Sequence, residues 1–489
     1  FYALTTTCCQ IDLLRLFKGG FSTGHGYLRE PQSIGSYAAL AAIAIQSNQN
    51  DQHGGQGVPN FDCAMAQGVA KSFARLYRRK LRDALEDVLD SEDETELARQ
   101  ATEAGEEATG HPARLEIDAE RFDEAVCAAL VGTGRLDEKA AASIVRRARR
   151  RAAESTDRDT FQAMEGFVHN LNTMHSRAGA QTPFSSINYG TDTSPEGRMV
   201  IRNILLAEDA GLGHGETPIF PIHIFKVKEG VNYNPGDPNY DLFQLSCRVS
   251  AKRLFPNYVF LDSPFNLQYY RPGHPETEVA TMGCRTRVMG NFYDPEREIA
   301  YSRGNLSFTS INLPRLAIES KGDEALFYEK LDAMMEMVAQ QLLDRFEIQA
   351  SKRVYNYPFL MGQGVWLDSD RLGPNDEVRE VLKHGSLSIG FIGLAETLTA
   401  LYGHHHGESE EMQEKGLQII SHMREFCDRR GKEMGLNFGL LATPAEGLSG
   451  RFLRMDQKRY GIIPGVTDRE YYTNSFHIPV WYETSAYDT

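Results

Sequence analysis

Short apolar segments with strand character alternate with long amphipathic helical segments along this chain, and the alternation favours an α/β architecture with much parallel sheet. Residues 218–228 and 257–262 are predicted to be buried strands bounded by Gly, Pro and Asn turns. Amphipathic helices fit residues 323–350 and 410–425, and a further helix is predicted from 386 to 402. A chain of 489 residues can form one large α/β barrel-like unit or two to three smaller domains.

The first 70 residues are expected to begin this α/β unit. A strand-like stretch at 5–13 leads into a glycine-rich turn at Gly19 and Gly20. Ser33 stands where it can cap a helix whose small apolar face covers residues 37–45.

A charged helical region is predicted at residues 71–160. Residues 82–107 hold eleven acids and two bases, and residues 146–151 hold five arginines. Apolar residues keep helical spacing through the acidic stretch. Two interpretations stay open: solvated faces of peripheral helices, or a dimer surface that carries a regulatory nucleotide site.

Charge and cysteine content exclude several classes of protein. The net charge of −15 argues against binding to a long nucleic-acid backbone, although a small phosphorylated ligand remains compatible. No apolar run reaches the roughly 20 residues of a membrane helix. Seven cysteines without a CxxC pair indicate reduced cytoplasmic thiols and no disulfide framework. Because the chain begins at Phe1 with no signal-like segment after it, we expect an excerpt of a longer protein.

Cys284 is the first candidate for chemistry. Small and polar residues surround it, with Gly283 before it and Gly290 after it, which predicts a loop tip. A cysteine is more often a small buried hydrophobe. Arg285 and Arg287 are unusual neighbours for a buried thiol, however, and they would favour the thiolate.

Cys8 and Cys9 stand side by side. On a strand, adjacent side chains point to opposite faces, so only one of the two can face a shared pocket. One interpretation makes both cysteines packing residues; the other makes one of them a donor of an electron and a proton to a partner thiol.

A row of neutral polar residues follows Cys284 at strand spacing. Asn305, Ser307 and Thr309 alternate with Leu306 and Phe308, which predicts hydrogen-bonding groups on one face of a strand. Such a face suits a polyol such as ribose, and it equally suits an ordinary buried polar network.

Two stretches look able to hold phosphate groups. One is a predicted turn rich in Thr, Ser and Gly at residues 442–451, and the other precedes the helix expected from residue 386. The candidate phosphate-binding residues are Thr443, Ala445, Glu446, Gly447, Ser449, Gly385 and Ser386.

Other catalytic signals are weak. The run His404–His406 has no carboxylate or cysteine at obvious ligand spacing, so we interpret it as a polar loop and predict no metal site. GxSxG, HExxH and P-loop motifs are absent from the sequence.

Taken together, long segments in series resemble the anaerobic (class III) ribonucleoside-triphosphate reductases. The resemblance covers residues 5 to about 480 and is weakest across 82–151. The segments that carry it are TTTCCQIDL, GGFSTGHGYLREPQSIGSYAALAAIAIQSNQNDQHGGQ, GAQTPFSSINYG, NPGDPNYDLF, TMGCRTRV, RGNLSFTSINLPRLAIE, GSLSIGFIGLAE, ATPAEGLSGRF and GVTDREYYTNSFHIPV.

The resemblance implies a ten-stranded α/β barrel of two antiparallel halves, each with five parallel strands, and a finger loop through its middle around residues 279–290. Cys284 matches the radical cysteine of that loop. Cys8 or Cys9 matches the cysteine of the first barrel strand, and Cys8 is favoured. Asn305 matches the asparagine that binds the ribose hydroxyls, and the ATPAEGLSG turn is similar to the loop that receives the substrate phosphates.

The family also implies cofactors and partners. These are a glycyl radical and a zinc site in a C-terminal segment, ATP and deoxynucleotide effectors, a radical S-adenosylmethionine activase with a [4Fe-4S] cluster, formate or a redoxin as reductant, and a homodimer. The sequence departs from the family in having no Cys after Cys427 and no Gly after Gly465, and in beginning at the barrel without the ATP-sensing domain. We therefore expect a fragment or one half of a split enzyme.

Two alternative functions remain. One is another glycyl-radical enzyme, but such enzymes resembling pyruvate formate-lyase carry paired cysteines on the finger loop, where this loop has Cys284 alone. The other is a catalytically silent nucleotide-binding subunit.

Overall fold

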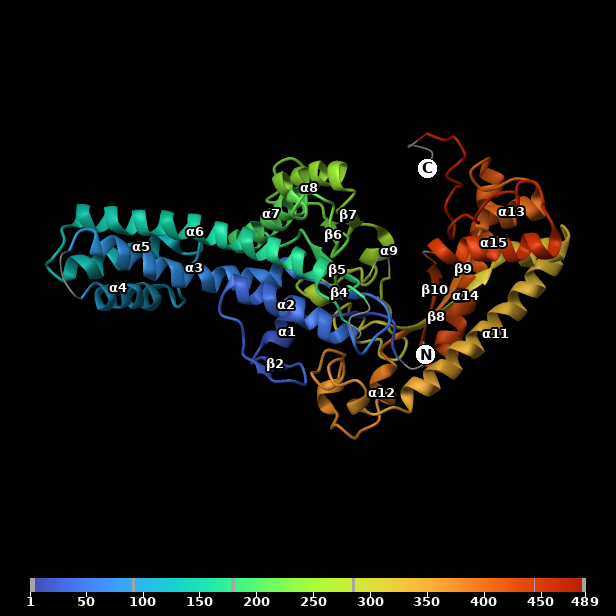
Figure 1. Ribbon diagram of the computed structural model, residues 1–489, viewed down its shortest axis with the longest axis horizontal. Helices are drawn as coiled ribbons and strands as arrows, with labels where there is room; N and C mark the ends of the chain where they lie inside the picture. Colours follow the sequence, from blue (N-terminus) through green and yellow to red (C-terminus); the bar gives the residue numbers. More distant parts are fainter. Residues whose placement is uncertain (1–4, 90–92, 177–180, 284–285, 444, 486–489) are drawn as a thin grey trace.

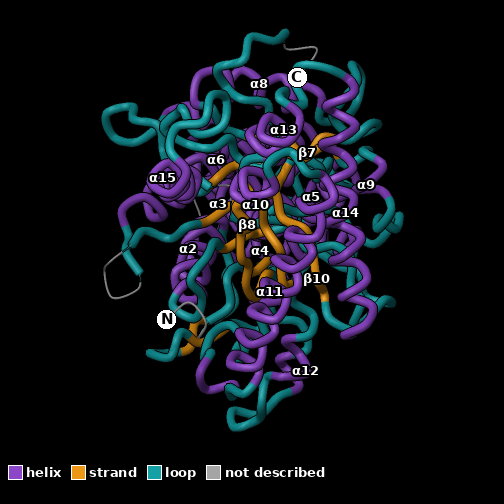
Figure 2. Tube along the Cα trace, turned by 90° about the vertical axis from the view of Figure 1, so that its right-hand side faces the viewer, coloured by secondary structure: helices purple, strands orange, loops and turns teal. Residues whose placement is uncertain are grey.

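The computed structural model describes residues 5–89, 93–176, 181–283, 286–443 and 445–485. Its strands lie centrally and its helices lie outside them (Figure 2). The first sheet has five parallel strands in the order β1-β4-β5-β6-β7. These strands are β1 (Cys9–Gln10), β4 (Gln56–Val58), β5 (Ser185–Tyr189), β6 (Ile222–Val227) and β7 (Asn257–Phe260).

A second sheet of three parallel strands has the order β10-β9-β8. Its strands are β8 (Asn305–Asn312), β9 (Ser386–Ile392) and β10 (Asn437–Ala442). The helices of this half are α10 (Leu313–Ser320), α11 (Glu324–Ala350), α12 (Arg379–Leu382), α13 (Leu394–Tyr402), α14 (Glu410–Met434) and α15 (Glu446–Tyr460), drawn from yellow through orange to red in Figure 1.

The two sheets meet at β1 and β8. Thr7 N donates to Asn305 O at 2.9 Å, and Gln10 N donates to Arg303 O at 2.9 Å. Because the partner number falls as the β1 number rises, the two strands run antiparallel. The α/β fold with two antiparallel halves of parallel strands is therefore present, with five and three strands in the described part of the chain.

Four helices extend from the first half as an arm, at the left of Figure 1. They are α3 (Phe61–Glu86), α4 (Glu94–Thr109), α5 (Ala119–Gly132) and α6 (Glu138–Thr173). The arm has its own buried apolar cluster, which includes Tyr77, Phe122 and Val145. The borders expected at residues 71 and 160 fall inside α3 and α6, so two continuous helices join the arm to the sheet.

The remaining elements complete the first half and the connections. The helices are α1 (Leu13–Phe17), α2 (Ile34–Gln49), α7 (Pro195–Ala210), α8 (Tyr240–Arg253) and α9 (Pro264–Leu267), with short 3-10 turns at Pro275–Thr277, Val354–Asn356 and Ser369–Arg371. A two-stranded antiparallel ribbon pairs β2 (Phe21–Ser22) with β3 (Tyr27–Leu28). Within the described residues, no helix is both long enough and apolar enough to span a membrane.

Helix starts follow their sequence signals. Ser33 caps α2 by accepting a hydrogen bond from Ser36 N at 3.3 Å, as its position predicted. Asp323 caps α11 by accepting from Leu326 N at 3.0 Å. The predicted cap at Ser33 and the predicted helix at residues 323–350 are confirmed.

Three predictions of secondary structure are wrong. Residues 386–392 form β9, and the helix starts only at Leu394, after Gly393 with φ of +81°; a short apolar run does not distinguish a buried strand from a helix. Strand β7 is half-exposed, not buried. The predicted turn at 442–451 is mostly helix, because α15 begins at Glu446.

Candidate active site

Cys8 and Cys9 occupy different environments. Cys8 packs with Met282 and Val288, which stand on either side of Cys284 in the sequence. Cys9 is fully buried in the main core, its thiol donates to Gln10 O at 3.6 Å, and burial raises its pKa. Cys8 is therefore the cysteine on the side of the finger loop.

The strand that carries Cys8 lies against the strand that carries Asn305. Thr7 N and Cys8 N both donate to Asn305 O, at 2.9 and 3.1 Å. A Cβ on Gly304 would lie 1.8 Å from Cys8 O, so only glycine permits this approach. The joint between the two sheets therefore brings Cys8 and Asn305 together.

Asn305 has one satisfied and one unsatisfied side-chain atom. Its Nδ2 donates to Ser388 Oγ at 2.6 Å and to Ser386 Oγ at 3.1 Å. Its Oδ1 is buried and has no hydrogen-bond partner among the described residues. Leaving such an acceptor unpaired costs about 1–3 kcal/mol, which a ligand hydroxyl in this position would recover.

Cys284 and Arg285 lie outside the described residues. The residues on either side of them show where the finger loop lies. Met282 and Thr286 form an antiparallel bridge, with N–H···O distances of 2.9 and 3.3 Å. Gly283 lies against β4, because a Cβ on Gly55 would stand 2.7 Å from Gly283 Cα. The loop therefore reaches the inner side of the first sheet.

Asn188 holds the base of the finger loop. Thr281 N donates to Asn188 Oδ1 at 2.8 Å, and Asn188 Nδ2 donates to Thr281 O at 2.8 Å. Ser186 Oγ also donates to Thr281 O, at 3.3 Å. Sequence reasoning missed Asn188, although the polar alternation of Ser186 and Asn188 in the segment GAQTPFSSINYG was a signal for it.

A cavity of about 690 Å³ lies between the finger loop and the carboxyl ends of β9 and β10. Arg287 and Met289 line it from the loop, and Phe391 and Ala442 line it from the strands. The Arg287 guanidinium donates to Asn266 Oδ1 at 2.8 Å, and burial lowers its pKa. Arg424 also lines the wall but pairs with Asp428 at 3.0 Å, so Arg287 is the cation that makes the cavity suit an anionic ligand.

The predicted phosphate-binding residues Thr443 to Ser449 stand where β10 gives way to α15. Thr443 Oγ1 lies 2.8 Å from Ser310 Oγ, and Ala445 N donates to Asn474 Oδ1 at 3.1 Å. Gly447 and Ser449 belong to the first turns of α15. This is a helix N-terminus, where backbone N–H groups and the helix dipole favour anions; the side chain of Glu446 lies outside the described part.

Gly385 and Ser386 do not form the second phosphate cradle that was predicted. Ser386 begins β9 and accepts the hydrogen bond from Asn305, so no helix N-terminus is present there. A Cβ on Gly385 would lie 2.6 Å from the Leu306 side chain, which explains the glycine by packing. The reason for the error is the strand at 386–392, which was predicted to be a helix.

The predicted polar row on β8 is broken by a bulge. The pairing register shifts between Asn305 and Ser307, so alternation does not continue past Leu306. Ser307 Oγ accepts from Arg345 Nη1 at 2.9 Å and Thr309 Oγ1 donates to Gln341 Oε1 at 2.9 Å, both on α11. Asn305 alone of the three therefore faces Ser386 and Ser388.

The histidine run forms a polar loop with a carboxylate partner that sequence reasoning overlooked. His404 Nδ1 lies 2.7 Å from Glu408 Oε2, and His406 Nε2 lies 2.7 Å from Phe476 O. Within the described residues, no three side chains of the metal-ligating types gather at one point.

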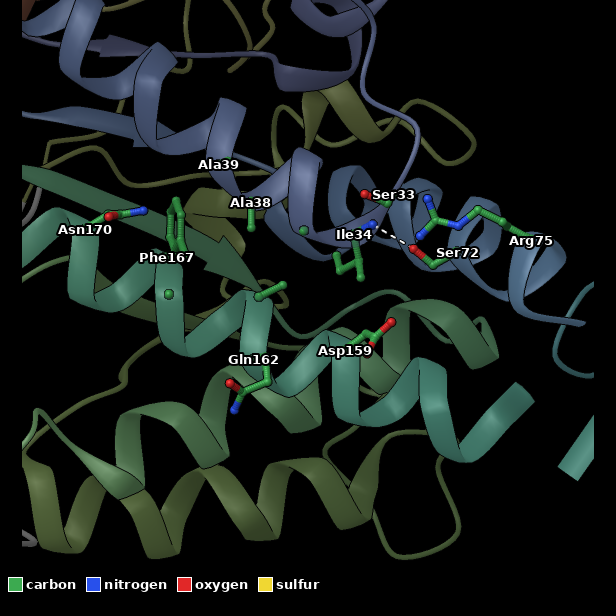
Figure 3. Close-up of a pocket in the computed structure, with 13 residues that line it drawn as sticks. Ser33, Ile34, Ala38, Ala39, Ser72, Arg75, Asp159, Gln162, Phe167 and Asn170 are labelled. Atoms are coloured by element: carbon green, nitrogen blue, oxygen red, sulfur yellow. Dashed lines mark hydrogen bonds between the residues drawn. The ribbon is translucent and has the colours of Figure 1, made fainter. Parts of the chain in front are cut away.

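A further cavity of about 390 Å³ opens between α2, α3 and α6 (Figure 3). Small residues such as Gly35, Ala38 and Gly166 form much of its wall. At one end of the cavity, Ile34 N donates to Ser72 Oγ at 2.8 Å. The exposed side chain of Arg75 also lines the cavity. Its position at the root of the helical arm separates it from Cys8 and Asn305.

Comparisons with known proteins agree with this geometry. A family model described as anaerobic ribonucleoside-triphosphate reductase matches residues 1–489. The enzyme of that name from Salmonella typhimurium is 31% identical over 98% of this chain and 58% of its own length, and that of Enterobacteria phage T4 is 29% identical over 97% and 67%. The chain thus spans less than two thirds of the length of the bacterial relative.

Solved structures show the same fold. The anaerobic ribonucleotide reductase from Thermotoga maritima in complex with dATP and CTP matches with a TM-score of 0.63 at 14% identity, covering 100% of this chain and 67% of that one. The same enzyme with citrate in its active site gives a TM-score of 0.61. The predicted reductase-type α/β fold is confirmed.

Proposed function

Because the chain belongs to the anaerobic ribonucleoside-triphosphate reductase family, we propose that it carries the barrel in which ribonucleoside triphosphates are reduced to deoxyribonucleoside triphosphates for DNA synthesis. The observation that supports this most is the meeting of Cys8, Asn305 and the finger loop at the joint of the two sheets. Cys8 and Asn305 are far apart in the sequence, and the antiparallel joint of the two sheets brings them into contact.

The proposed reaction starts at Cys284. Its thiyl radical takes the hydrogen atom from ribose C3′, which forms an S–H bond and leaves the radical on carbon. The protonated 2′-hydroxyl then leaves as water. Cys8 is the proposed donor of one proton and one electron to the substrate radical, and the external reductant supplies the second electron and restores the Cys8 thiol. Cys284 finally returns a hydrogen atom to C3′, so the overall change consumes two electrons and two protons per ribonucleotide.

Asn305 and the basic cavity are proposed to hold the substrate. The unpaired Oδ1 of Asn305 accepts a hydrogen bond from a ribose hydroxyl. The α15 N-terminus, with Thr443, Ala445, Gly447 and Ser449, receives the phosphates. Arg287 adds charge at the same cavity.

The proposal includes partners and cofactors outside the described residues. A glycyl radical, generated by a radical S-adenosylmethionine activase with a [4Fe-4S] cluster, would supply the one-electron oxidation of the Cys284 thiol. Formate or a redoxin thiol would supply the two electrons consumed. ATP and deoxynucleotide effectors, a homodimer and a cytoplasmic location complete the proposal.

The test is anaerobic formation of deoxycytidine triphosphate by this chain with a supplied glycyl-radical segment and its activase. We expect product that disappears in Cys284→Ser, while nucleotide still binds. Cys247→Ser is the matched control, because Cys247 is exposed on α8 and lies outside the proposed site. Nucleotide binding with no turnover in any reconstitution would instead favour a silent nucleotide-binding subunit.

A further inference from the structure

A cavity of about 310 Å³ lies at the carboxyl ends of β4, β5 and β6, outside the proposed active site. Asn60 follows β4, Thr191 follows β5, and Lys226 and Lys228 stand at the end of β6. In parallel α/β sheets, the crevice outside the carboxyl ends of the strands is the usual place for ligands. The first half of the fold therefore offers a ligand position of its own.

The N-terminus of α3 opens onto this cavity, and its cap residue has a free acceptor. Asn60 is the N-cap of the 26-residue helix, yet its side chain makes no capping hydrogen bond. The residue is 6% exposed, and its Oδ1 has no partner among the described residues. A buried acceptor in this condition costs about 1–3 kcal/mol unless a ligand donates to it.

The cavity also contains an ammonium group that no acid neutralises. Lys228 Nζ lies 4.0 Å from the centre of the Tyr270 ring, and in the described part of the chain no carboxylate pairs with it. Lys226, by contrast, is 2% exposed and binds Glu278 Oε2 at 2.6 Å. Lys228 and the positive end of the α3 dipole therefore attract an anion to the mouth of this cavity.

The acid in the first turn of α3 does not cancel that attraction. Asp62 Oδ2 accepts from Gly190 N at 2.8 Å and from Thr191 N and Asp192 N, both at 3.1 Å. Asp62 Oδ1 accepts from Cys63 N at 3.0 Å. Four backbone N–H groups thus occupy both oxygens of this carboxylate and fix the loop that forms one wall, and burial raises the pKa of Asp62, which disfavours its negative charge.

We propose that this cavity binds a small hydroxylated anion, a carboxylate or a phosphate ester that also bears a hydroxyl group. The anionic group lies at Lys228 and the α3 N-terminus, and the hydroxyl donates to Asn60 Oδ1. The Tyr270 ring covers one side. Since Glu278 and Tyr301 line the cavity and flank the segment that carries the finger loop, the ligand contacts the root of that loop.

Protection of Lys228 from acetylation by an N-hydroxysuccinimide acetate, read by peptide mass spectrometry, gives a local test on the whole chain. The probes are lactate and glycerol 3-phosphate, and the exposed Lys139 on α6 reports general effects. We expect at least one probe to protect Lys228 and neither to protect Lys139. Protection by lactate alone assigns a carboxylate and by glycerol 3-phosphate alone a phosphate ester; no protection by either at millimolar concentrations overturns the proposal.

Two variants locate the binding. Asn60→Ala should weaken protection by about tenfold or more, and its unfolding temperature should stay unchanged because the side chain makes no capping bond. Arg287→Gln alters the larger, separate cavity and should leave the protection of Lys228 intact. Undiminished protection in Asn60→Ala, or its loss in Arg287→Gln, would overturn the assignment to this cavity.

Discussion

The side chain of Asn188 and the backbone of Thr281 bind each other twice, with both hydrogen bonds at 2.8 Å. The same Nδ2 also donates to Val58 O at 3.0 Å. The Asn188 side chain thereby makes hydrogen bonds of the kind that a neighbouring strand would make. It holds the finger loop against β5 and β4 at Thr281, three residues before Cys284. The position of the loop depends on a side chain that is fully buried in the first sheet.

Asn188→Asp should impair turnover more than nucleotide binding. The substitution replaces the Nδ2 donor by an oxygen that faces two carbonyls, and each buried carbonyl left unpaired costs about 1–3 kcal/mol. We expect kcat for deoxynucleotide formation to fall by about 100-fold or more, with a smaller change in KM. Anaerobic steady-state kinetics, with urea unfolding in parallel, measure both effects.

Asn172→Asp is the matched control for this prediction. Asn172 also binds backbone groups with its amide, through Val168 O at 2.7 Å and Ile219 N at 2.9 Å, but lies away from the finger loop. It should lower the free energy of unfolding without lowering kcat of the folded enzyme. Equal kcat losses in the two variants would show that Asn188 has only a structural role.

Cys8→Ala should affect activity, whereas Cys9→Ala should affect stability. The first should abolish turnover because the thiol that packs against Met282 and Val288 is removed. The second should retain turnover and lose about 1 kcal/mol of stability or somewhat more, since it removes a buried core atom. Product analysis and denaturant unfolding distinguish them; turnover by Cys8→Ala with none by Cys9→Ala would reverse the assignment.

Asn305→Ala should slow reduction with a smaller loss of nucleotide binding. The amide anchors Ser386 and Ser388 and offers its unpaired Oδ1 to the substrate. We expect kcat to fall by about 10- to 100-fold. Ser307→Ala should leave kcat nearly unchanged, because Ser307 binds Arg345 and is not on the Asn305 side; unchanged kinetics in Asn305→Ala would remove Asn305 from the site.

Gly304→Ala should disturb the joint between the two sheets and lower the stability of the protein. Its Cβ would lie 1.8 Å from Cys8 O, so the β1–β8 joint must move, at a cost of about 3 kcal/mol or more. Gly439→Ala on β10 is the control, because nothing lies within 4 Å of its Cβ position. Thermal unfolding of the two variants measures the difference, and equal stabilities would contradict the close approach.

Glu208 should contribute a decrease in the free energy of unfolding as pH rises from about 4.5 to about 7. Glu208 is fully buried beside His223, and desolvation raises its pKa from 4.5 to about 7. Because the folded state then holds a proton that the unfolded state releases, folding is favoured at the acid end of this window and loses that advantage as pH passes through the folded pKa.

Glu208→Gln isolates this effect in urea unfolding measured across pH. His223 acts in the opposite direction, since burial lowers its pKa from 6.5 to about 3 and its protonation in the unfolded state opposes folding at low pH. Because the two contributions oppose each other between about pH 4.5 and 6.5, the stability of the wild type should change little there, whereas the glutamine variant should gain stability as pH rises through the same window. An unaltered pH profile would contradict the buried, protonated Glu208.

Local signals in the sequence were sufficient for the starts of several helices and for the family. Ser33 predicted the start of α2, because a cap and its helix lie within a few residues, and amphipathic spacing over residues 323–350 predicted α11. Long motifs around Cys8, Cys284 and Asn305 indicated the family, which the comparisons confirm. The roles of these residues remain proposals.

Only the tertiary structure decided what depends on contacts distant in sequence. Asn188 binds Thr281 across 93 positions, and no periodicity reveals such a pair. The bulge after Asn305 turns Ser307 away from the site, and residues 386–392 become a strand because β8 and β10 flank them. The sequence determined the family and where several helices begin, while packing between the two sheets decided which side chains meet, because strand pairing and face depend on neighbours that the local chain does not contain.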